Sequence, residues 1–262
     1  MSKRIPAEGF KGRGALANPA NRFDQMHTEL VDDGWFQDEA AASIATELRV
    51  DATRGIIARN DSPDIPFEQS INPYRGCEHG CVFCFARPSH AYLGLSPGID
   101  FETKLVYKPT AAALLREELA KPGYVCRHIR MGSNTDPYQP VERQLRITRS
   151  ILEVLAETHH PVAITTRSTL LLRDIDLLAP MAAQGLASVV YSITTFDHDL
   201  KRRLEPRSAA SLARLAAVRE LRAAGIPVGV LAAPLIPAVN DSELEEILER
   251  SAAAGVLHAG YT

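Results

Sequence analysis

The 262-residue sequence lacks the features of a membrane-spanning, exported or strongly charged protein. Its longest nearly apolar stretch, residues 228–239, is shorter than the roughly 20 residues that cross a bilayer and contains two prolines. The first ten residues, MSKRIPAEGF, lack the apolar core of a secretory signal. A formal net charge of −3 argues against a surface that binds polyanions in general. We therefore expect a soluble protein of the cytoplasm.

Cysteine is also scarce, with four residues in the whole chain. Three of them, Cys77, Cys81 and Cys84, fall within eight residues of each other in the run INPYRGCEHGCVFCFARPSH. Thiols stay reduced in the cytoplasm, so this cluster indicates metal binding rather than disulfides. Cys126 has no cysteine near it in the sequence, and we expect it to be a small buried side chain.

Three thiolates on one loop suit an iron-sulfur cluster or a zinc ion, and three protein ligands leave one metal position open for chemistry. Zinc sites commonly combine two separated Cys-x2-Cys pairs, or one such pair and two histidines, and the spacing here matches neither. An electron-transfer ferredoxin would need four cysteine ligands. An open iron-sulfur site is therefore favoured, and a non-catalytic iron-sulfur or zinc module that stabilises its loop or binds a partner is the alternative.

From Ser70 onward, short β-rich runs alternate with helical segments. This alternation predicts an α/β fold with helices packed on a parallel sheet. The predicted strands cover residues 71–75, 128–133, 162–167, 188–195, 227–233 and 257–262, and residues 104–108 form a possible additional strand.

Helix ends can also be predicted. One helix begins after Thr110, a second is capped by Ser208 and ends at Gly225, and a third has a capping box of Ser242 and Glu245 and ends at Gly255.

The first 65 residues show little apolar periodicity and are predicted to be an N-terminal extension, residues 1–65, before a main domain of residues 66–262. A modest helix is expected from Asp38 to Leu48. The KGRG segment, residues 11–14, is expected to be an irregular arm packed on the main domain rather than a nucleic-acid contact.

The unusual sequences follow the predicted strands. The cysteines follow the first strand, and GSNTDPYQPVE, TTRS and SITTFD end or follow the next three. Reacting groups of parallel βα folds collect at these carboxyl ends, so the segments are expected to meet. The residues of the GSNTD segment are also common in ordinary turns, so this segment alone does not decide between a turn and a site.

The pattern Cys77-x3-Cys81-x2-Cys84, with Phe83 before the last cysteine, resembles the signature of radical S-adenosylmethionine (radical SAM) enzymes. The order GRGA, PYRGC and GSNTDPYQP is similar to that of a bacterial subgroup related to spore photoproduct lyase. The resemblance covers roughly residues 66–262 and implies a partial (β/α)6 barrel. Because the sequence stops within the sixth predicted strand, we expect the barrel to be incomplete at its C-terminus.

The resemblance also implies a mechanism. Cys77, Cys81 and Cys84 would hold three irons of a 4Fe-4S cluster, and the fourth iron would bind the amino and carboxylate groups of S-adenosylmethionine. An external one-electron reductant, such as flavodoxin or ferredoxin, would then drive cleavage to a 5'-deoxyadenosyl radical that abstracts hydrogen from a substrate. The resemblance leaves the catalytic residue unknown and implies these cofactor contacts: Phe83 beside the cluster and adenine, Gly132, Ser133, Asn134 and Asp136 near the amino group, Arg167 at the carboxylate, and Ser192 at the ribose.

One position departs from spore photoproduct lyase. That family carries a hydrogen-donating cysteine near the end of its second barrel strand, where this sequence has Ser133. A serine hydroxyl holds its hydrogen too strongly to replace a thiol, so repair of a DNA photolesion is not expected.

Several charged residues lie outside these segments. The basic cluster of Lys201, Arg202, Arg203 and Arg207 would allow a nucleic-acid substrate, but such clusters are more often a solvated face. Glu205 and Arg207 are expected to form a surface ion pair. His79 is expected to be a loop residue and not a fourth metal ligand.

Overall fold

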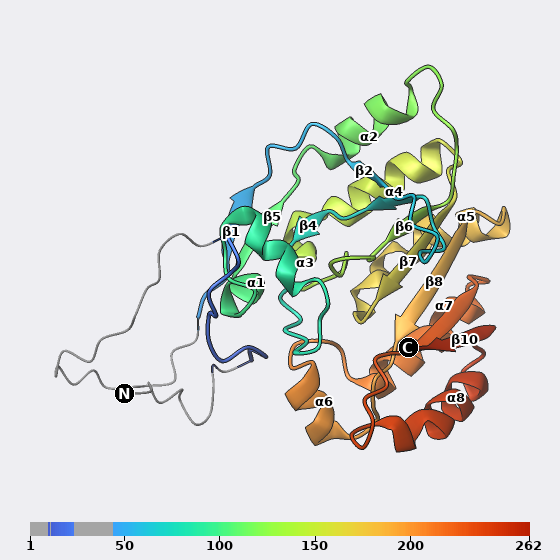
Figure 1. Cartoon of the computed structure of the whole chain (residues 1–262). Coiled ribbons are helices and arrows are strands. Elements are labelled where there is room, and N and C mark those ends of the chain that lie inside the picture. Colours follow the sequence, from blue (N-terminus) through green and yellow to red (C-terminus); the bar gives the residue numbers. More distant parts are fainter. Residues whose placement is uncertain (1–9, 11, 24–43) are drawn as a thin grey trace.

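The computed structural model describes residues 10, 12–23 and 44–262 (Figure 1). Its larger sheet has seven strands in the order β10-β9-β8-β7-β6-β3-β2. All neighbouring pairs are parallel except β2 with β3. These strands are β2 (Ile57–Arg59), β3 (Gln69–Ile71), β6 (Ile129–Met131), β7 (Val162–Thr166), β8 (Ala187–Ser192), β9 (Val228–Ala232) and β10 (His258–Tyr261). The predicted α/β fold with a mostly parallel sheet is confirmed.

A second sheet of three strands has the order β1-β5-β4. It contains β1 (Glu47–Val50), β4 (Tyr74–Arg75) and β5 (Lys104–Tyr107). The strand predicted over residues 71–75 is therefore split, because β3 ends at Ile71 and β4 pairs with β5. Pro73 lies between the two parts and has no amide hydrogen with which to continue a ladder. The predicted strand at 104–108 exists, but in this second sheet.

The helix predicted from Asp38 to Leu48 is wrong at its C-terminal end. Glu47 and Leu48 belong to β1, which pairs in parallel with β5, so pairing with a distant strand overrides local helix propensity. Residues 38–43 lie outside the described part of the chain.

Helices pack along the larger sheet on the side that carries the main apolar core (Figure 1). They are α2 (Ala111–Leu119), α4 (Ile147–Glu157), α5 (Ile175–Ala183), α7 (Ser211–Ala223) and α8 (Leu244–Ala253). Shorter helices are α1 (Ile99–Thr103), α3 (Glu142–Leu145), α6 (His198–Leu204) and the 3-10 segments Arg87–Leu93, Thr169–Asp174 and Asp241–Glu243. Among the described residues, no helix is long and apolar enough to cross a membrane.

Two predicted helix starts are wrong. Helix α7 begins at Ser211 after Ala210, and the Ser208 hydroxyl instead donates to Glu205 O at 2.9 Å. Ser242 lies in the 3-10 segment before α8, and the residue that caps α8 makes no side-chain capping bond. The predicted helix ends are confirmed, since Gly225 and Gly255 follow α7 and α8 with φ of 78° and 93°, a conformation that favours glycine.

Alternation along the strands gives the larger sheet two different faces. Ile129 and Met131 of β6 are fully buried in the core with residues of the helices, whereas Arg130 between them points to the opposite side. We call this opposite side the inner face. It carries residues paired in register across the strands: Ser70, Arg130, Ala163, Thr165, Ser188, Val190, Ser192, Gly229, Leu231, His258 and Gly260.

The core makes a first prediction. Ile151 on α4 is fully buried, so Ile151→Ala should lower the free energy of unfolding by about 2–5 kcal/mol through lost burial and the cavity that remains. Leu212 on α7 is 62% exposed, and Leu212→Ala should change it by no more than about 0.5 kcal/mol. Urea denaturation measures the free energy of unfolding of both variants. Equal losses in the two variants would contradict the burial of Ile151 and the exposure of Leu212.

Candidate functional site

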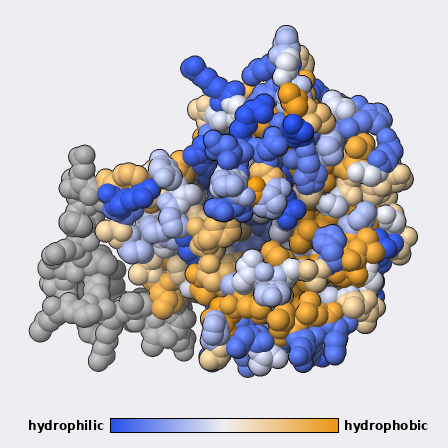
Figure 2. All heavy atoms as spheres, turned by 45° about the vertical axis from the view of Figure 1, so that its right-hand side comes forward, coloured by the Kyte–Doolittle hydropathy of each residue, from blue (hydrophilic) through white to orange (hydrophobic). Residues whose placement is uncertain are grey.

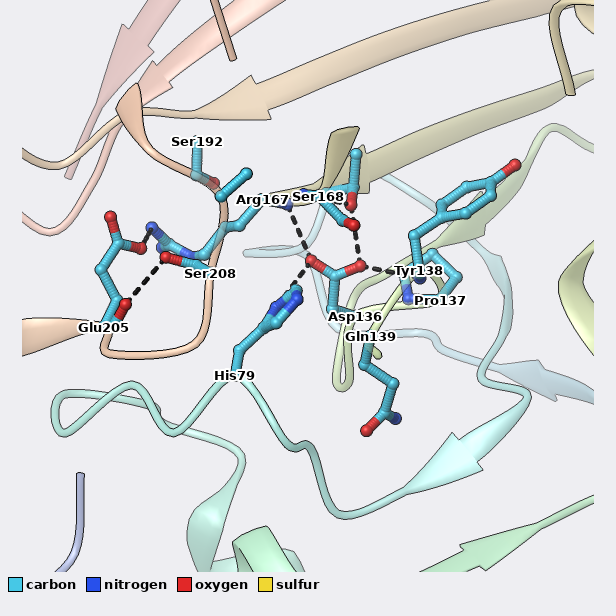
Figure 3. A network of polar contacts seen from close by, with 12 residues as sticks. His79, Asp136, Pro137, Tyr138, Gln139, Arg167, Ser168, Ser192, Glu205 and Ser208 are labelled. Atoms are coloured by element: carbon cyan, nitrogen blue, oxygen red, sulfur yellow. Dashed lines mark hydrogen bonds and ion pairs between the residues drawn. The ribbon is translucent and has the colours of Figure 1, made fainter. Parts of the chain in front are cut away.

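The sequences singled out above meet at the carboxyl ends of β6, β7 and β8, beside the loop that carries the three cysteines (Figure 3). This loop runs from Gly76 to Ala86, between β4 and the 3-10 segment Arg87–Leu93. Cys77 and Cys81 are buried, and Cys84 is half-buried. Parallel strands thus bring together groups separated by more than 100 residues of sequence.

The backbone of the cysteine loop is held by bonds from other segments. Cys77 N donates to Phe101 O at 2.9 Å, and Val82 N donates to Leu204 O at 2.9 Å. The Arg87 guanidinium donates to Cys81 O at 2.8 and 3.0 Å and to a carboxylate oxygen of Glu102 at 2.6 Å. The loop is thus held by Phe101, Leu204 and Arg87, which lie outside it.

The environment of the thiols suits a cationic group. Burial raises the pKa of Cys77, of Cys84 and of Cys81, the last to about 12. Three neighbouring thiolates therefore need a compensating metal at neutral pH. Arg167 near Cys81, and backbone amides near Cys77 and Cys84, oppose the effect of burial in part.

The arrangement of the donors bears on which metal group fits. Within the described ranges, no group of three or more His, Cys, Asp or Glu side chains is placed to hold one metal ion. A single tetrahedral zinc ion needs such convergence. An iron-sulfur cluster takes each thiolate on a different iron, so three thiols on one loop suit such a cluster without converging on a single ion.

The N-terminal arm, residues 12–23, packs directly on the cysteine loop. A Cβ on Gly14 would lie 1.8 Å from Gly80 O, so this contact requires a glycine. The Glu102 carboxylate accepts bonds from Gly14 N at 2.9 Å and from Ala15 N at 2.8 Å. The expectation of an arm packed on the main domain is confirmed for residues 12–14 of the KGRG segment, and residue 11 lies outside the described part of the chain.

Asp136 connects three parts of the site, as Figure 3 shows. Its carboxylate accepts bonds from Thr166 Oγ1 at 2.8 Å, Arg167 N at 2.7 Å and Tyr138 N at 2.8 Å. Its Oδ2 also lies 3.2 Å from Nδ1 of His79, an ion-pair contact from the cysteine loop. Burial would raise the pKa of this carboxyl, but His79 and the backbone amides of Arg167 and Tyr138 lower it below its ordinary value. Both oxygens of Asp136 are thus used within the protein.

His79 and Gln139 hold the cysteine loop against the segment after β6. His79 is 2% exposed, so this expected loop residue has a buried structural contact. Gln139 Oε1 accepts from Glu78 N at 2.9 Å, and its Nε2 donates to Gly76 O at 3.1 Å. Sequence analysis missed Gln139, because nothing in its local sequence indicates a bond to a loop about 60 residues away.

The glycine of the GSNTD segment has a steric role. Gly132 has a φ of 83°, and a Cβ at this position would lie 2.1 Å from Thr165 O. Only glycine allows β6 to leave the sheet so close to β7. Ser133 and Asn134 follow it, and Asn72 contacts both, accepting from Asn134 N at 3.1 Å.

A buried ion network lies on the other side of the site (Figure 3). Glu205 is fully buried and pairs with Arg167 at 3.0 Å and with Arg214 at 2.7 Å. The predicted surface ion pair is therefore wrong for Glu205, because two arginines from β7 and α7 converge on it. Arg207 pairs instead with Glu78, at 3.4 Å.

The same network positions two further predicted site residues. The Arg167 guanidinium lies 5.1 Å from the centre of the Phe83 ring and also donates to Ala233 O at 3.1 Å. Ser192, at the end of β8, accepts a bond from Arg214 through its carbonyl at 2.7 Å. Phe83, Arg167 and Ser192 thus belong to one contiguous group with the cysteine loop.

Two other predictions are corrected by burial. Lys201 is 9% exposed and donates to Ser208 O, so the basic cluster is not a solvated face throughout; Arg202 and Arg203 are its exposed members. Cys126 is exposed rather than buried, because it lies in the segment between α2 and β6 that leaves the core.

The network makes a second prediction. Glu205→Gln would leave the buried guanidinium of Arg214 and the half-buried guanidinium of Arg167 without their carboxylate, and should lower the free energy of unfolding by about 3–5 kcal/mol. Glu157, whose exposed carboxylate pairs with Arg116, gives the matched control. Glu157→Gln should lower the free energy of unfolding by at most about 1 kcal/mol. Similar losses for both variants in urea denaturation would show that Glu205 is not the centre of a buried network.

Known proteins match the chain in sequence and in fold. A protein of Mycobacterium tuberculosis is 42% identical over 193 residues, which cover 73% of this chain and 57% of that protein. The chain thus spans little more than half the length of this curated relative. The structure of spore photoproduct lyase complexed with dinucleoside spore photoproduct has a TM-score of 0.59 at 17% identity and covers 82% of this chain and 60% of that one.

A mutant of the same lyase with bound AdoMet and dinucleoside spore photoproduct has a TM-score of 0.57 at 17% identity, with the same coverage. At this identity the likeness shows the fold alone. The family model of the radical SAM superfamily matches residues 71–250, which include the cysteine loop and four parallel strands of the larger sheet, β6 to β9. The chain therefore belongs to the radical SAM superfamily.

Proposed function

We propose that the protein is a radical SAM enzyme in which Cys77, Cys81 and Cys84 bind a 4Fe-4S cluster with one open iron. The observation that carries this proposal is the placement of three mostly buried thiols on one loop at the carboxyl ends of parallel strands. When bound, the cluster supplies an electron for reductive cleavage of S-adenosylmethionine to a 5'-deoxyadenosyl radical, which abstracts hydrogen from a substrate.

The residues around the thiols support this role. Backbone amides directed at Cys77 and Cys84, and the guanidinium of Arg87 near Cys84, favour negative charge on sulfur. Hydrogen bonds and burial of this kind tune the potential of a cluster. The N-terminal arm and Glu102 cover the loop and limit access of solvent to it.

The charge of the Arg167–Glu205–Arg214 network supports a site for the cofactor carboxylate. Two guanidinium groups share one carboxylate, so the network keeps one net positive charge next to Cys81. Arg167, whose guanidinium lies 5.1 Å from the centre of the Phe83 ring, is the half-buried member of this network. We assign the cofactor carboxylate to Arg167, the adenine to the vicinity of Phe83, and the ribose to Ser192.

For the cofactor amino group we propose the segment Gly132, Ser133 and Asn134. Asp136 was grouped with them by sequence, but its oxygens are occupied by Thr166, Tyr138, Arg167 and His79. Its proposed role is to position this segment, the end of β7 and the cysteine loop relative to each other.

The larger architecture is also part of the proposal. The mostly parallel order of the larger sheet supports a partial (β/α)6 barrel over residues 66–262 with an extension at residues 1–65. Strands β1 and β2 of the extension pair with β5 and β3, which favours an extension packed on the barrel over an independent domain. An external one-electron reductant such as flavodoxin or ferredoxin, in the cytoplasm, completes the scheme.

The substrate is not fixed by these contacts. Arg202 and Arg203 are the exposed members of the basic cluster, and two cations are weak support for binding a phosphate backbone. The proposal therefore does not depend on a nucleic-acid substrate.

Loss of a thiol tests the cluster. Anaerobic reconstitution with iron and sulfide, then reduction with S-adenosylmethionine, should yield 5'-deoxyadenosine from the wild-type protein and none from Cys81→Ala, because one iron loses its ligand. Cys126→Ala, which removes the exposed cysteine, should retain wild-type iron content and yield.

The same experiment separates the proposal from a non-catalytic metal module. A wild-type protein with four irons and four sulfides per chain that yields no 5'-deoxyadenosine would overturn the proposed chemistry. Stoichiometric zinc in place of iron in protein purified without oxygen would favour a structural metal site.

Ser133 generates a further prediction. Because serine cannot replace a hydrogen-donating thiol, the wild-type protein should not convert a dinucleoside spore photoproduct or a thymine photodimer, as measured by chromatography of the products. Repair of either lesion would show that the alignment of Ser133 with the thiol of the lyase is wrong.

A further inference from the structure

Arg130 is unusual among the arginines of the protein. It is half-buried at the centre of β6, yet its side chain makes no hydrogen bond, ion pair or ring contact with any described residue. Every other buried or half-buried arginine in the described ranges has such a partner: Arg13, Arg75, Arg87, Arg149, Arg167, Arg173, Arg207, Arg214 and Arg222. A partly desolvated guanidinium with five unused donors is costly, and a ligand would remove that cost.

The residues around Arg130 leave it room. Its neighbours in register on the inner face are Ser70 on β3 and Ala163 on β7, and Ser188 on β8 follows in the same row. All three side chains are small, so one long cationic side chain rises from a row of short ones. Among the described inner-face residues there is no aspartate or glutamate to neutralise it.

A second unused donor lies on the same face. Thr165 is two residues beyond Ala163 on β7, and its Oγ1 is buried without a hydrogen-bond partner. Thr165 stands at the level of Gly132, whose close contact with Thr165 O places the two strand ends together. The inner face thus offers a cation and, nearer the cysteine loop, an unsatisfied hydroxyl.

The distance suits a substrate that also reaches the site. Arg130 precedes Gly132 by two residues, which is about 7 Å along a strand, and an arginine side chain can span most of that length. The inner face is continuous with the strand ends that carry Arg167 and Ser192. Figure 2 shows hydrophilic and hydrophobic residues around a hollow on one face of the molecule.

We propose that Arg130 and Thr165 bind an oxyanion of the substrate, a phosphate or carboxylate group, on the inner face of the sheet. This deepens the proposed function and rests on it, since it names the chemical class of substrate for the same site. Arginine matches both groups through paired N–H donors, and a threonine hydroxyl can donate a further bond to either.

The test uses the full chain and small probes, methyl phosphate and acetate, at constant ionic strength set with sodium chloride. Thermal stabilisation as a function of probe concentration gives a dissociation constant for each probe. We expect saturable binding of at least one probe to the wild type, and the preferred probe distinguishes a phosphate from a carboxylate substrate. Arg130→Gln should weaken it by about 10-fold or more, because a charge-assisted bond is lost.

Three further variants make the result specific. Arg130→Lys should bind more tightly than Arg130→Gln, because the charge is kept, and Thr165→Val should weaken binding without a change in volume. Arg219→Gln, which removes an exposed arginine on α7, should bind like the wild type. If Arg130→Gln does not fold, probe binding by Arg130→Lys and Thr165→Val still tests the proposal.

Absence of saturable binding to the wild type, or equal binding by Arg130→Gln and the wild type, would overturn this inference. Equal weakening by Arg219→Gln would also overturn it, since the effect would then come from overall charge. Binding of these probes needs no reduced cluster. A failure to form 5'-deoxyadenosine would therefore count against the proposed function alone. Unchanged probe binding by Arg130→Gln would count against the proposed role of Arg130 alone.

Discussion

The site depends on one constraint, which is that an irregular loop with buried thiols must satisfy its buried backbone polar groups. No strand or helix does this for residues 76–86, so side chains from other segments supply the bonds. Gln139 bonds the start of the loop, and Arg87 bonds its middle. The loop can therefore hold three thiols in fixed positions without regular secondary structure.

Buried carboxylates extend the same principle from the loop to the whole site. Glu102 joins the N-terminal arm to Arg87, Asp136 joins the segment after β6 to β7, and Glu205 joins β7 to α7. Each buried charge is matched by nearby donors, which is what makes its burial tolerable. Arg130 differs from these groups, because this half-buried cation has no such partner among the described residues, and the proposed oxyanion site rests on that difference.

Much of the fold and part of the site could be predicted from the sequence. Strong alternation of β-rich and helical segments was enough to locate five of the six parallel strands, β6 to β10, because apolar periodicity reflects local packing. The same reasoning failed for residues 71–75 and for Glu47 and Leu48, where pairing with β5 decided the structure. The helix starts at Ser208 and Ser242 were wrong because a capping residue type does not show which competing bond its side chain makes.

The sequence by itself determined the chemical class of this protein, because the spacing of Cys77, Cys81 and Cys84 is a local property of one loop. It also determined that glycine and polar residues end the strands around them. Only the tertiary structure decided which charges are buried and which are paired. Glu205 pairs with Arg167 across 38 positions of sequence, and Gln139 bonds to Glu78 across 61. Arg130 has no hydrogen bond, ion pair or ring contact with any residue that the structure describes. Such pairing depends on which segments the sheet brings together, so the sequence near each residue does not predict its partner.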